Sequence, residues 1–281
     1  MFTWVGVGIT PLGELFSRWE LRLAHVFHQN YTDEYQMRYA IADIHGGNLT
    51  FQALLRKIDF RRTDQLFLLG DYVDRGPDSM GVLETMCCLI EAGYDVRPIR
   101  GNHDEMLLRT IINDHDDYSE MYFDTWGRYT LESFEIKASG HSISKYELLH
   151  FPELIVPDFF PSKYLNLLES LPYIQVEPDY IFVHAGLDMS RNDPFSESDS
   201  YHMLWSRSIT VVPEKMGGRQ LVTGHMVRMI DDIRQSLDST HIRLDNGAFT
   251  RQLPEMGNLV ALNLDTKELI VQPWCDGEAY D

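Results

Sequence analysis

The 281-residue sequence predicts an α/β (α+β) fold, because short apolar segments of strand type alternate with amphipathic helical segments. The alternation begins near Met37, and each early strand ends where a short polar motif begins. The later half of the chain consists mainly of short strand-like segments separated by turn residues. Ligands of α/β proteins collect at the carboxyl ends of strands, so the polar motifs mark a candidate site.

The first half of this region predicts a β-α-β-α-β order. Predicted strands cover residues 39–44, 65–69 and 96–100, and predicted helices cover residues 48–58, 79–92 and 105–112. Residues 113–161 differ, because acidic and aromatic side chains are frequent there. We interpret this segment as a mostly helical insertion beside the site. Its aromatic residues at 118–126 fit packing better than substrate binding.

The second half predicts strands joined by short turns. These strands cover residues 173–176, 180–184, 220–223, 242–246, 259–263 and 268–272. Residues 178–179 and 265–267 have turn composition and predict hairpins. We predict one domain with mixed sheets at residues 37–281. Residues 1–36 are interpreted as an N-terminal extension, although the apolar pattern equally allows a genuine helix at residues 12–29.

Charge and composition exclude several classes of partner. The chain has 43 acidic residues against 24 Lys and Arg residues, and its net charge of -19 repels nucleic acid backbones. No segment has the about 20 consecutive apolar residues of a membrane helix, and residues 1–15 lack the basic start of a signal peptide. The three cysteines, of which Cys87 and Cys88 are adjacent, do not predict a disulfide framework and favour a cytoplasmic location. The sequence leaves the oligomeric state open.

Five polar motifs occur in a fixed order along the chain. They are DIHG at residues 43–46, GDYVDRG at 70–76, GNHD at 101–104, HAG at 184–186 and GHM at 224–226. The candidate metal ligands that they supply are Asp43, His45, Asp71, Asn102, His184 and His225. Carboxylates, imidazoles and an amide without a thiolate favour Mn²⁺, Fe²⁺ or Zn²⁺. A carboxylate can bridge two cations about 3.5–4 Å apart, and Asp71 is the candidate for that position because it is central in the motif order.

The motif set resembles the PPP-type phosphoprotein phosphatases, within the broader calcineurin-like metallophosphoesterases, and most closely the bacterial serine/threonine protein phosphatases. The resemblance covers about residues 37–272. It implies a calcineurin-like metallophosphatase fold, in which helices flank a central β-sandwich. It also implies two divalent metal ions, Mn²⁺ in the first place, with Fe or Zn as alternatives. By this similarity the first ion is held by Asp43, His45 and Asp71, and the second by Asp71, Asn102, His184 and His225.

The resemblance further implies a mechanism. A hydroxide between the two ions would attack phosphorus in line, while Arg75 holds the phosphoryl oxygens. The family has a second arginine after a Leu-Trp pair, which Arg207 matches at the end of the sequence LWSR. His103 would protonate the departing oxygen, and Asp74 would pair with His103 and favour its charged form. Ions and arginines together would leave the site at roughly +3, so a phosphate dianion can enter despite the acidic chain.

The expected activity is hydrolysis of phosphomonoesters, in particular phosphoserine and phosphothreonine in proteins. One departure leaves an alternative open, because Asp104 stands where the protein phosphatases usually have glutamate. The GNHD form also occurs in the related symmetrical dinucleoside tetraphosphate hydrolases, which usually lack an acid at the position of Asp74. The alternative is therefore such a hydrolase or another small-molecule phosphoesterase. In a different class, a scaffold without activity would bind partners through residues 113–161.

Overall fold

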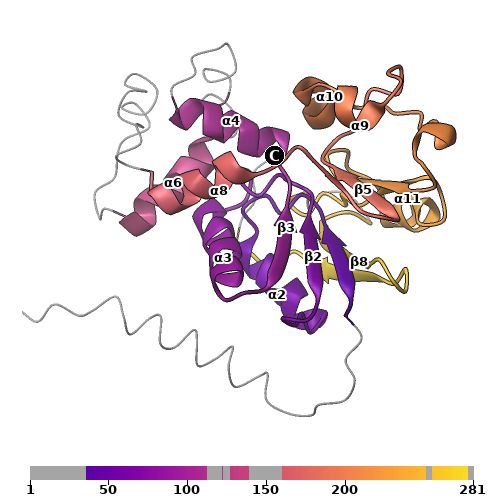
Figure 1. Cartoon of the computed structure of the whole chain (residues 1–281). Helices are drawn as coiled ribbons and strands as arrows, with labels where there is room; N and C mark the ends of the chain where they lie inside the picture. The colour runs from indigo at the N-terminus through magenta and orange to yellow at the C-terminus, as the bar shows by residue number, and fades with distance from the viewer. Residues whose placement is uncertain (1–35, 113–121, 123–126, 139–159, 251–254, 278–281) are drawn as a thin grey trace, which may run out of the picture. The chain divides into compact units, whose positions relative to one another are not determined.

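The computed structural model describes residues 36–112, 122, 127–138, 160–250 and 255–277 (Figure 1). All of these residues lie in the unit Gln36–Asp281. The expected N-terminal extension at residues 1–36 lies outside the described residues apart from Gln36. Much of the expected insertion at residues 113–161 also lies outside them.

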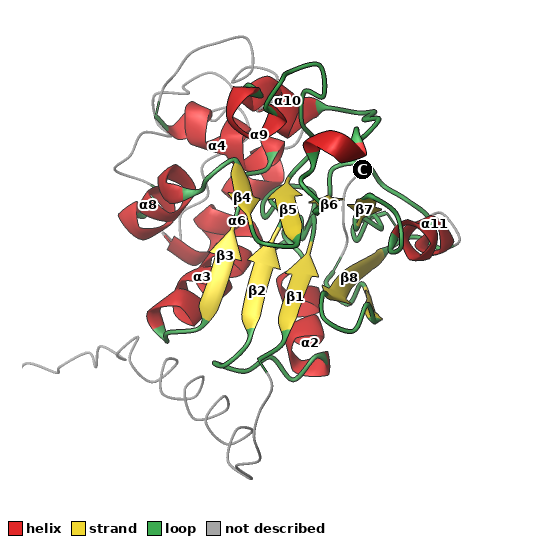
Figure 2. Cartoon of the chain, turned by 45° about the vertical axis from the view of Figure 1, so that its right-hand side comes forward, coloured by secondary structure: helices red, strands yellow, loops and turns green. Residues whose placement is uncertain are grey.

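The first of two mixed β-sheets holds the early strands of the chain (Figure 2). Its strands are β1 (Arg38–Ile41), β2 (Gln65–Leu68), β3 (Asp95–Pro98), β8 (Asn258–Asn263) and β9 (Leu269–Pro273). Their order is β3-β2-β1-β8-β9. β1, β2 and β3 are parallel, with Ala40 opposite Phe67 and Phe67 opposite Arg97. β8 is antiparallel to both β1 and β9, so residues 265–267 connect a hairpin as predicted.

The second sheet holds the four strands that lie between β3 and β8 in the chain. These are β4 (Ile174–Val176), β5 (Tyr180–Val183), β6 (Gln220–Thr223) and β7 (His241–Arg243). They pair in this order, β4 being antiparallel to β5 and the others parallel. The predicted turn at residues 178–179 connects β4 and β5. Parallel strands in both sheets bring their carboxyl ends to common edges.

Alternating side chains join the two sheets into a β-sandwich, as the family resemblance implies. Ala40 and Phe67 of the first sheet pack in one apolar cluster with Phe182 and Val222 of the second. The rings of Phe67 and Phe182 stack with 4.2 Å between their centroids. Ile41, next to Ala40 along β1, points to the opposite face and belongs to a different cluster. Because side chains alternate along a strand, one face of β1 packs against the second sheet and the other face packs against the helices.

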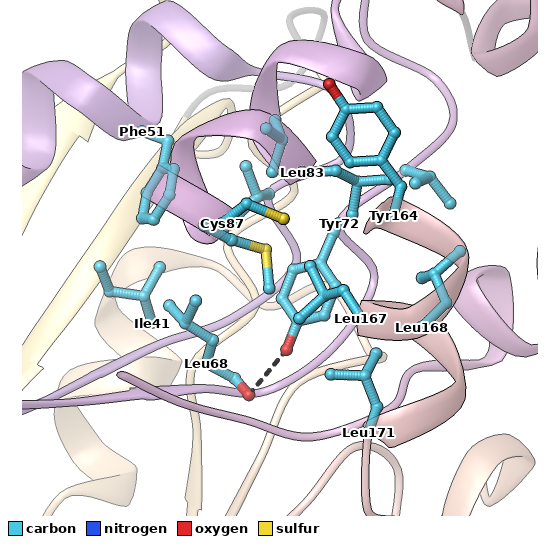
Figure 3. Packing of buried hydrophobic residues seen from close by; sticks show 14 of the residues in the cluster. Ile41, Phe51, Leu68, Tyr72, Leu83, Cys87, Tyr164, Leu167, Leu168 and Leu171 are labelled. Atoms are coloured by element: carbon cyan, nitrogen blue, oxygen red, sulfur yellow. Dashed lines mark hydrogen bonds between the residues drawn. The ribbon is translucent and has the colours of Figure 1, made fainter. Parts of the chain in front are cut away.

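Helices cover that opposite face of the first sheet. They are α2 (Asn48–Lys57), α3 (Ser79–Glu91), α4 (Asn102–Ile111), α6 (Gly127–Ala138) and α8 (Ser162–Ser170). Phe51 of α2, Leu83 of α3 and Leu167 of α8 pack in the same cluster as Ile41 and Leu68 (Figure 3). α3 also contacts α6, which brings part of the predicted insertion against the domain.

Shorter helices accompany the second sheet. They are α9 (Pro194–Glu197), α10 (Ser200–Trp205), the 3-10 helix η2 (Pro213–Lys215) and α11 (Ile230–Ser236). Met203 of α10 packs with Val183 and Leu221 in a third apolar cluster. Within the described ranges, no helix is long and apolar enough to cross a bilayer.

Most predicted elements are confirmed, with bounds that shift by up to three residues, as at the ends of β1 and β7. The prediction that the helix after the third strand begins at residue 105 is wrong, because α4 begins at Asn102. The side chain of Asp104 accepts the N–H of Gly101 at 2.9 Å, and the Gly101 carbonyl accepts the N–H of Glu105 at 3.0 Å. These bonds start the helix one turn earlier. Cys87 and Cys88 lie on α3, as predicted, and none of the three cysteines forms a disulfide.

Candidate metal centre

The six predicted metal ligands follow strands of both sheets. They are Asp43 and His45 after β1, Asp71 after β2, Asn102 after β3, His184 after β5 and His225 after β6. Five of these residues are buried, and His225 is partly buried. Residues more than 100 positions apart in the chain thus gather where the carboxyl ends of the strands meet.

The backbone of these motifs is unusual. Six motif residues have a positive φ, namely Asp43, His45, Asp71, Asp74, Arg75 and His225. Only a few per cent of residues other than glycine adopt this region. Bonds between neighbouring loops support the conformation, since the N–H of His45 donates to the Asp71 carbonyl at 2.9 Å. Strained backbone of this kind costs on the order of 1–3 kcal/mol per residue and is concentrated at functional sites.

One group of candidate ligands combines both sheets. Nε2 of His184 lies 2.8 Å from Oδ1 of Asn102 and 3.4 Å from Oδ2 of Asp71. Nδ1 of His225 lies 3.0 Å from the same Asn102 oxygen. The ligand atoms of Asp71, His184 and His225 all lie within 4.8 Å of one another. The structure therefore brings together the four residues expected at the second ion.

A second group lies on the other side of Asp71. It consists of His45, Asp71 and His103, whose ligand atoms also lie within 4.8 Å of one another. Nε2 of His45 lies 3.5 Å from Oδ2 of Asp71, and the His45 and His103 rings meet edge to face at 4.8 Å. Asp71 belongs to both groups. That is the arrangement expected of a carboxylate between two neighbouring cations.

The hydrogen bonds of His184 and His45 leave their Nε2 atoms available to bind a cation. Nδ1 of His184 lies 2.8 Å from the Leu69 carbonyl oxygen, and Nδ1 of His45 lies 2.9 Å from the Val73 carbonyl oxygen. A carbonyl oxygen only accepts, so each Nδ1 carries the proton and each Nε2 presents a lone pair toward Asp71. Burial lowers the pKa of His184 to about 4 and holds the pKa of His45 well below its ordinary value, which keeps both rings neutral. Lone pairs that face one another in a buried site call for a cation between them.

His225 and Asp43 are linked at the edge of this arrangement. Nε2 of His225 is buried and has no hydrogen-bond partner among the described residues. The backbone N–H of His225 donates to both carboxylate oxygens of Asp43, at 3.0 and 3.1 Å. Asp43 belongs to neither three-residue group, so the structure joins it to the site through His225. A Cβ atom on Gly224 would lie 1.9 Å from Oδ2 of Asp43, so only glycine permits this approach.

Asp104 orders the loops that carry two of the ligands. Its carboxylate accepts backbone N–H groups of Asp71 at 2.8 Å, Tyr72 at 3.0 Å and Gly101 at 2.9 Å. Burial, with the like charge of Asp71, raises the pKa of Asp104 to about 8. The aspartate that departs from the phosphatase pattern therefore ties the β2 loop to the start of α4.

His103 and Asp74 are in direct contact. Nδ1 of His103 lies 2.7 Å from Oδ2 of Asp74, which is fully buried. Burial, and then the charge of Arg75, hold the pKa of His103 well below its ordinary value. Burial also raises the pKa of Asp74 to about 7. The pairing agrees with the sequence prediction, but burial works against the charged form of His103 that the prediction assumed.

The two predicted phosphate-binding arginines have different surroundings. Arg75 is partly buried, and its guanidinium lies 4.3 Å from the centroid of the Phe249 ring. Phe249 also meets the ring of His45 edge to face at 5.0 Å. Arg207 follows α10 and is exposed. Burial is the largest cause that lowers the pKa of His225 to about 3, and the charges of His184 and Arg207 act in the same direction.

Several residues of the site lie outside the five motifs. Tyr122 and Thr130 donate hydrogen bonds to Asp74 from the predicted insertion. Tyr122 is buried in an apolar cluster, as the expected packing role requires, while the other aromatic residues at 118–126 lie outside the described residues. Asp245, which follows β7, is buried, and burial raises its pKa to about 6. Its position after a strand could have identified Asp245, whereas Tyr122 and Thr130 carry no sequence signal of a site.

Comparisons with known proteins agree with this geometry. The sequence model of a family described as calcineurin-like phosphoesterase matches residues 39–229. The symmetrical bis(5'-nucleosyl)-tetraphosphatases of Nitrosomonas europaea and Delftia acidovorans are similar to the chain, with 49% and 46% identity over 71 residues. These alignments cover 25% of this chain and 25% and 24% of the two relatives. The chain thus matches about a quarter of the length of these relatives.

Solved structures share the fold. One assigned as a diadenosine tetraphosphatase has a TM-score of 0.57 at 22% identity, and the match covers 88% of this chain and 97% of the other. A cold-active protein-tyrosine phosphatase of a Shewanella species has a TM-score of 0.50 at 17% identity, covering 86% and 80%. At these identities the likeness concerns the fold alone.

Proposed function

We propose that this chain, which belongs to the calcineurin-like phosphoesterase family, hydrolyses dinucleoside tetraphosphates at a centre of two divalent cations. The observation that carries the hydrolytic function is the position of Asp71 in both groups of ligand atoms. The substrate class is supported by the two tetraphosphatases that are 46–49% identical over 71 residues. Because that segment is a quarter of each relative, the substrate of the whole chain is part of the proposal.

The ligand set fits a pair of cations. His45 and Asp71 would hold one cation, with Asp43 beside them, and the other would be held by Asp71, Asn102, His184 and His225. Bound divalent cations supply Lewis acidity and lower the pKa of water toward neutrality. Mn²⁺ is the first choice, because this mixture of carboxylate, imidazole and amide ligands suits it, and Fe or Zn would also fit.

Side chains of the protein would bind and orient the phosphate chain. Arg75 presents a planar guanidinium, which matches two phosphoryl oxygens better than a lysine would. The Phe249 ring lies 4.3 Å from the Arg75 guanidinium and would help to hold it in place. Arg207, which follows α10 and is exposed, would receive a second phosphate group of an extended substrate.

A second candidate is hydrolysis of phosphomonoesters, including phosphoserine and phosphothreonine in proteins. The observation that favours it is the 2.7 Å contact between His103 and Asp74. An alkoxide is a poor leaving group and needs a proton from a general acid, whereas a nucleoside diphosphate leaves as a stable anion. A buried acid pair therefore has more to contribute to ester cleavage than to tetraphosphate cleavage.

A comparison of kcat/KM for two substrates separates the two candidate functions. The purified chain with Mn²⁺ is given diadenosine tetraphosphate or a phosphoserine peptide at equal concentrations, and kcat/KM is measured for each. We expect a preference for the tetraphosphate of about 10-fold or more, with ADP as the sole nucleotide product. Asp71→Asn serves as the inactive control.

Two other outcomes are informative. Preference for the peptide would replace the leading substrate by the second candidate. Turnover of neither substrate by protein that binds Mn²⁺ would contradict both and favour the scaffold alternative.

A further inference from the structure

The carboxylate of Asp74 is held by two hydroxyl groups that come from the predicted insertion. Oδ1 of Asp74 accepts the hydroxyl of Tyr122 at 2.7 Å and the hydroxyl of Thr130 at 2.5 Å. Oδ2, the other oxygen, lies 2.7 Å from Nδ1 of His103. We propose that Tyr122 and Thr130 are positioning residues, which fix Asp74 so that His103 presents Nε2 to the departing oxygen. The inference rests on the second candidate function, hydrolysis of phosphomonoesters, and assigns the insertion a part in it.

The division of partners between the two carboxylate oxygens sets the orientation of Asp74. A carboxylate oxygen offers about two acceptor positions, and Tyr122 and Thr130 use both on Oδ1. Rotation of the carboxylate would break both of these bonds as well as the contact to His103. The hydroxyl groups therefore keep Oδ2 directed at Nδ1 of His103. With Nδ1 engaged by Asp74, Nε2 is the nitrogen through which the ring can deliver a proton.

Thr130 also controls the backbone of Asp74. Its hydroxyl oxygen accepts the N–H of Asp74 at 2.9 Å while its proton goes to Oδ1 of the same residue. Ser79 accepts the same N–H at 3.0 Å and lies 3.0 Å from the Thr130 hydroxyl. Asp74 has a φ of 70°, a conformation that the surrounding contacts must hold in place. Thr130 thus contacts Asp74 at both the main chain and the side chain.

Burial makes this arrangement sensitive to single atoms. Asp74, Ser79, Tyr122 and Thr130 all have no exposed surface. Water cannot easily replace a hydroxyl that is removed there, so an unsatisfied carboxylate oxygen would seek another partner. The nearest available change is rotation of Asp74 away from His103. Loss of the Tyr122 or Thr130 hydroxyl would therefore change the position of Asp74 and, through it, the orientation of His103, the proposed general acid.

The reaction step shows which substrates depend on this arrangement. As the P–O bond breaks, the leaving oxygen keeps the electron pair and takes the proton from Nε2 of His103. This step starts from His103 with a proton on both ring nitrogens, the charged form that burial disfavours. After the transfer the ring keeps the proton on Nδ1, Asp74 remains a carboxylate, and His103 regains the Nε2 proton from solvent before the next turnover. An alkoxide leaving group requires this proton, whereas a dinitrophenolate or a nucleoside diphosphate does not. The insertion should therefore matter most for alkyl phosphate esters.

The test uses full-length variants loaded with Mn²⁺. Tyr122→Phe and Thr130→Val remove one hydroxyl each, and Thr130→Ser restores the hydroxyl in a smaller side chain. Ser133→Ala is the matched control, because Ser133 is a buried residue of α6 that bonds to Met80 and to the Thr130 carbonyl but not to Asp74. Each variant is assayed with a phosphoserine peptide and with 2,4-dinitrophenyl phosphate.

We expect Tyr122→Phe and Thr130→Val to lower kcat for the peptide by about 10-fold or more, with KM and dinitrophenyl phosphate turnover nearly unchanged. Thr130→Ser and Ser133→Ala should keep the wild-type ratio between the two substrates. Equal losses on both substrates, or the same behaviour in Ser133→Ala, would overturn the inference, because a structural defect does not depend on the leaving group.

A second measurement does not require turnover. In protein loaded with diamagnetic Zn²⁺ in place of Mn²⁺, the ring N–H of His103 that faces Asp74 should give a downfield proton resonance, which His103→Asn removes and thereby assigns. This resonance should persist in Ser133→Ala and Thr130→Ser and weaken or move upfield in Tyr122→Phe. A resonance unchanged in Tyr122→Phe would overturn the positioning role. If the wild type hydrolysed no phosphate compound, the proposed function would fail, while this resonance would still decide whether Tyr122 positions the pair.

Discussion

Nε2 of His184 lies 3.4 Å from Oδ2 of Asp71, while Nδ1 of the same ring is bonded to the Leu69 carbonyl oxygen. The two facing atoms are both acceptors when His184 is neutral and Asp71 is ionised, so they need a cation or a proton between them. The same relationship holds between His45 and Asp71 on the other side of the carboxylate. Loading with cations should therefore change both stability and activity.

Addition of Mn²⁺ should raise the melting temperature of the chelator-treated protein. A ligand at 100 times its Kd adds about 2.7 kcal/mol to the free energy of unfolding. For a domain of this size that corresponds to roughly 5–10 °C. Differential scanning fluorimetry with a Mn²⁺ titration measures the shift, and an excess of chelator should reverse it. An unchanged melting temperature at saturating Mn²⁺ would contradict the site.

Asp71→Asn should lose binding at both cation positions, because one carboxylate contributes to both groups of ligands. Elemental analysis after gel filtration should show a fall from about two Mn²⁺ per chain to nearly none. Asp179→Asn is the control, since Asp179 forms an ion pair with Arg38 away from the motifs. A variant that still retained one tightly held cation would show that Asp71 serves only one position.

His103→Asn should keep both cations but lower kcat for a phosphoserine peptide by roughly 10²–10⁴-fold, because the departing alkoxide loses its proton source. KM for the peptide should change little. The same variant should cleave 2,4-dinitrophenyl phosphate at a rate close to that of the wild type. Turnover of the peptide that survives the substitution would rule out His103 as the general acid.

Gly224→Ala should damage the site even though it adds only a methyl group. The added Cβ would lie 1.9 Å from Oδ2 of Asp43, so the carboxylate or the loop of His225 must move. We expect a destabilisation of about 1–3 kcal/mol and weaker Mn²⁺ binding by calorimetry. Gly277→Ala is the matched control, because nothing lies within 4 Å of its added Cβ. Similar behaviour of the two variants would contradict the close approach.

Acid should weaken an ion pair on β3. A hydrogen bond from Arg97 is the main reason that the pKa of Asp95 lies below its ordinary value. A lowered folded pKa gives stability that is present above the unfolded pKa of about 3.9 and lost as the pH falls through the folded value. Asp95→Asn should therefore cost less than about 1 kcal/mol near neutral pH, since the pair is partly exposed.

Urea unfolding of the wild type and Asp95→Asn at about pH 6 and about pH 3 measures this dependence. The difference in unfolding free energy between the two proteins should shrink at the lower pH. A difference that grew on acidification would reverse the sign expected for a carboxylate with a lowered pKa.

Local patterns predicted the parts of the structure that depend on short stretches of chain. The apolar segment at residues 39–44 predicted the strand β1, and the turn residues at 265–267 located a hairpin. The gathering of the candidate metal ligands could be expected because each motif comes after a strand, and parallel strands bring their carboxyl ends together. Periodicity and strand ends are local signals, so one sequence suffices to read them.

Contacts that depend on tertiary packing could not be predicted in this way. Thr130 reaches Asp74 across 56 positions of sequence from a helix whose pattern has no chemical motif. The early start of α4 depends on the Asp104 side chain folding back to Gly101. The lowered pKa of His103 results from burial, which is a property of the folded chain. In each case the decisive neighbour is set by the fold.

The candidate ligands His184 and His225 follow strands of the second sheet, whereas His45, Asp71 and Asn102 follow strands of the first. The proposed second cation position takes donors from both sheets, so it would form only when the two sheets are packed together. A bound ion would then cross-link the two sheets. Its release would weaken the contact between the sheets, to which the stacked rings of Phe67 and Phe182 also contribute. Cation exchange and separation of the layers should consequently be coupled, with slow ion loss in the intact molecule.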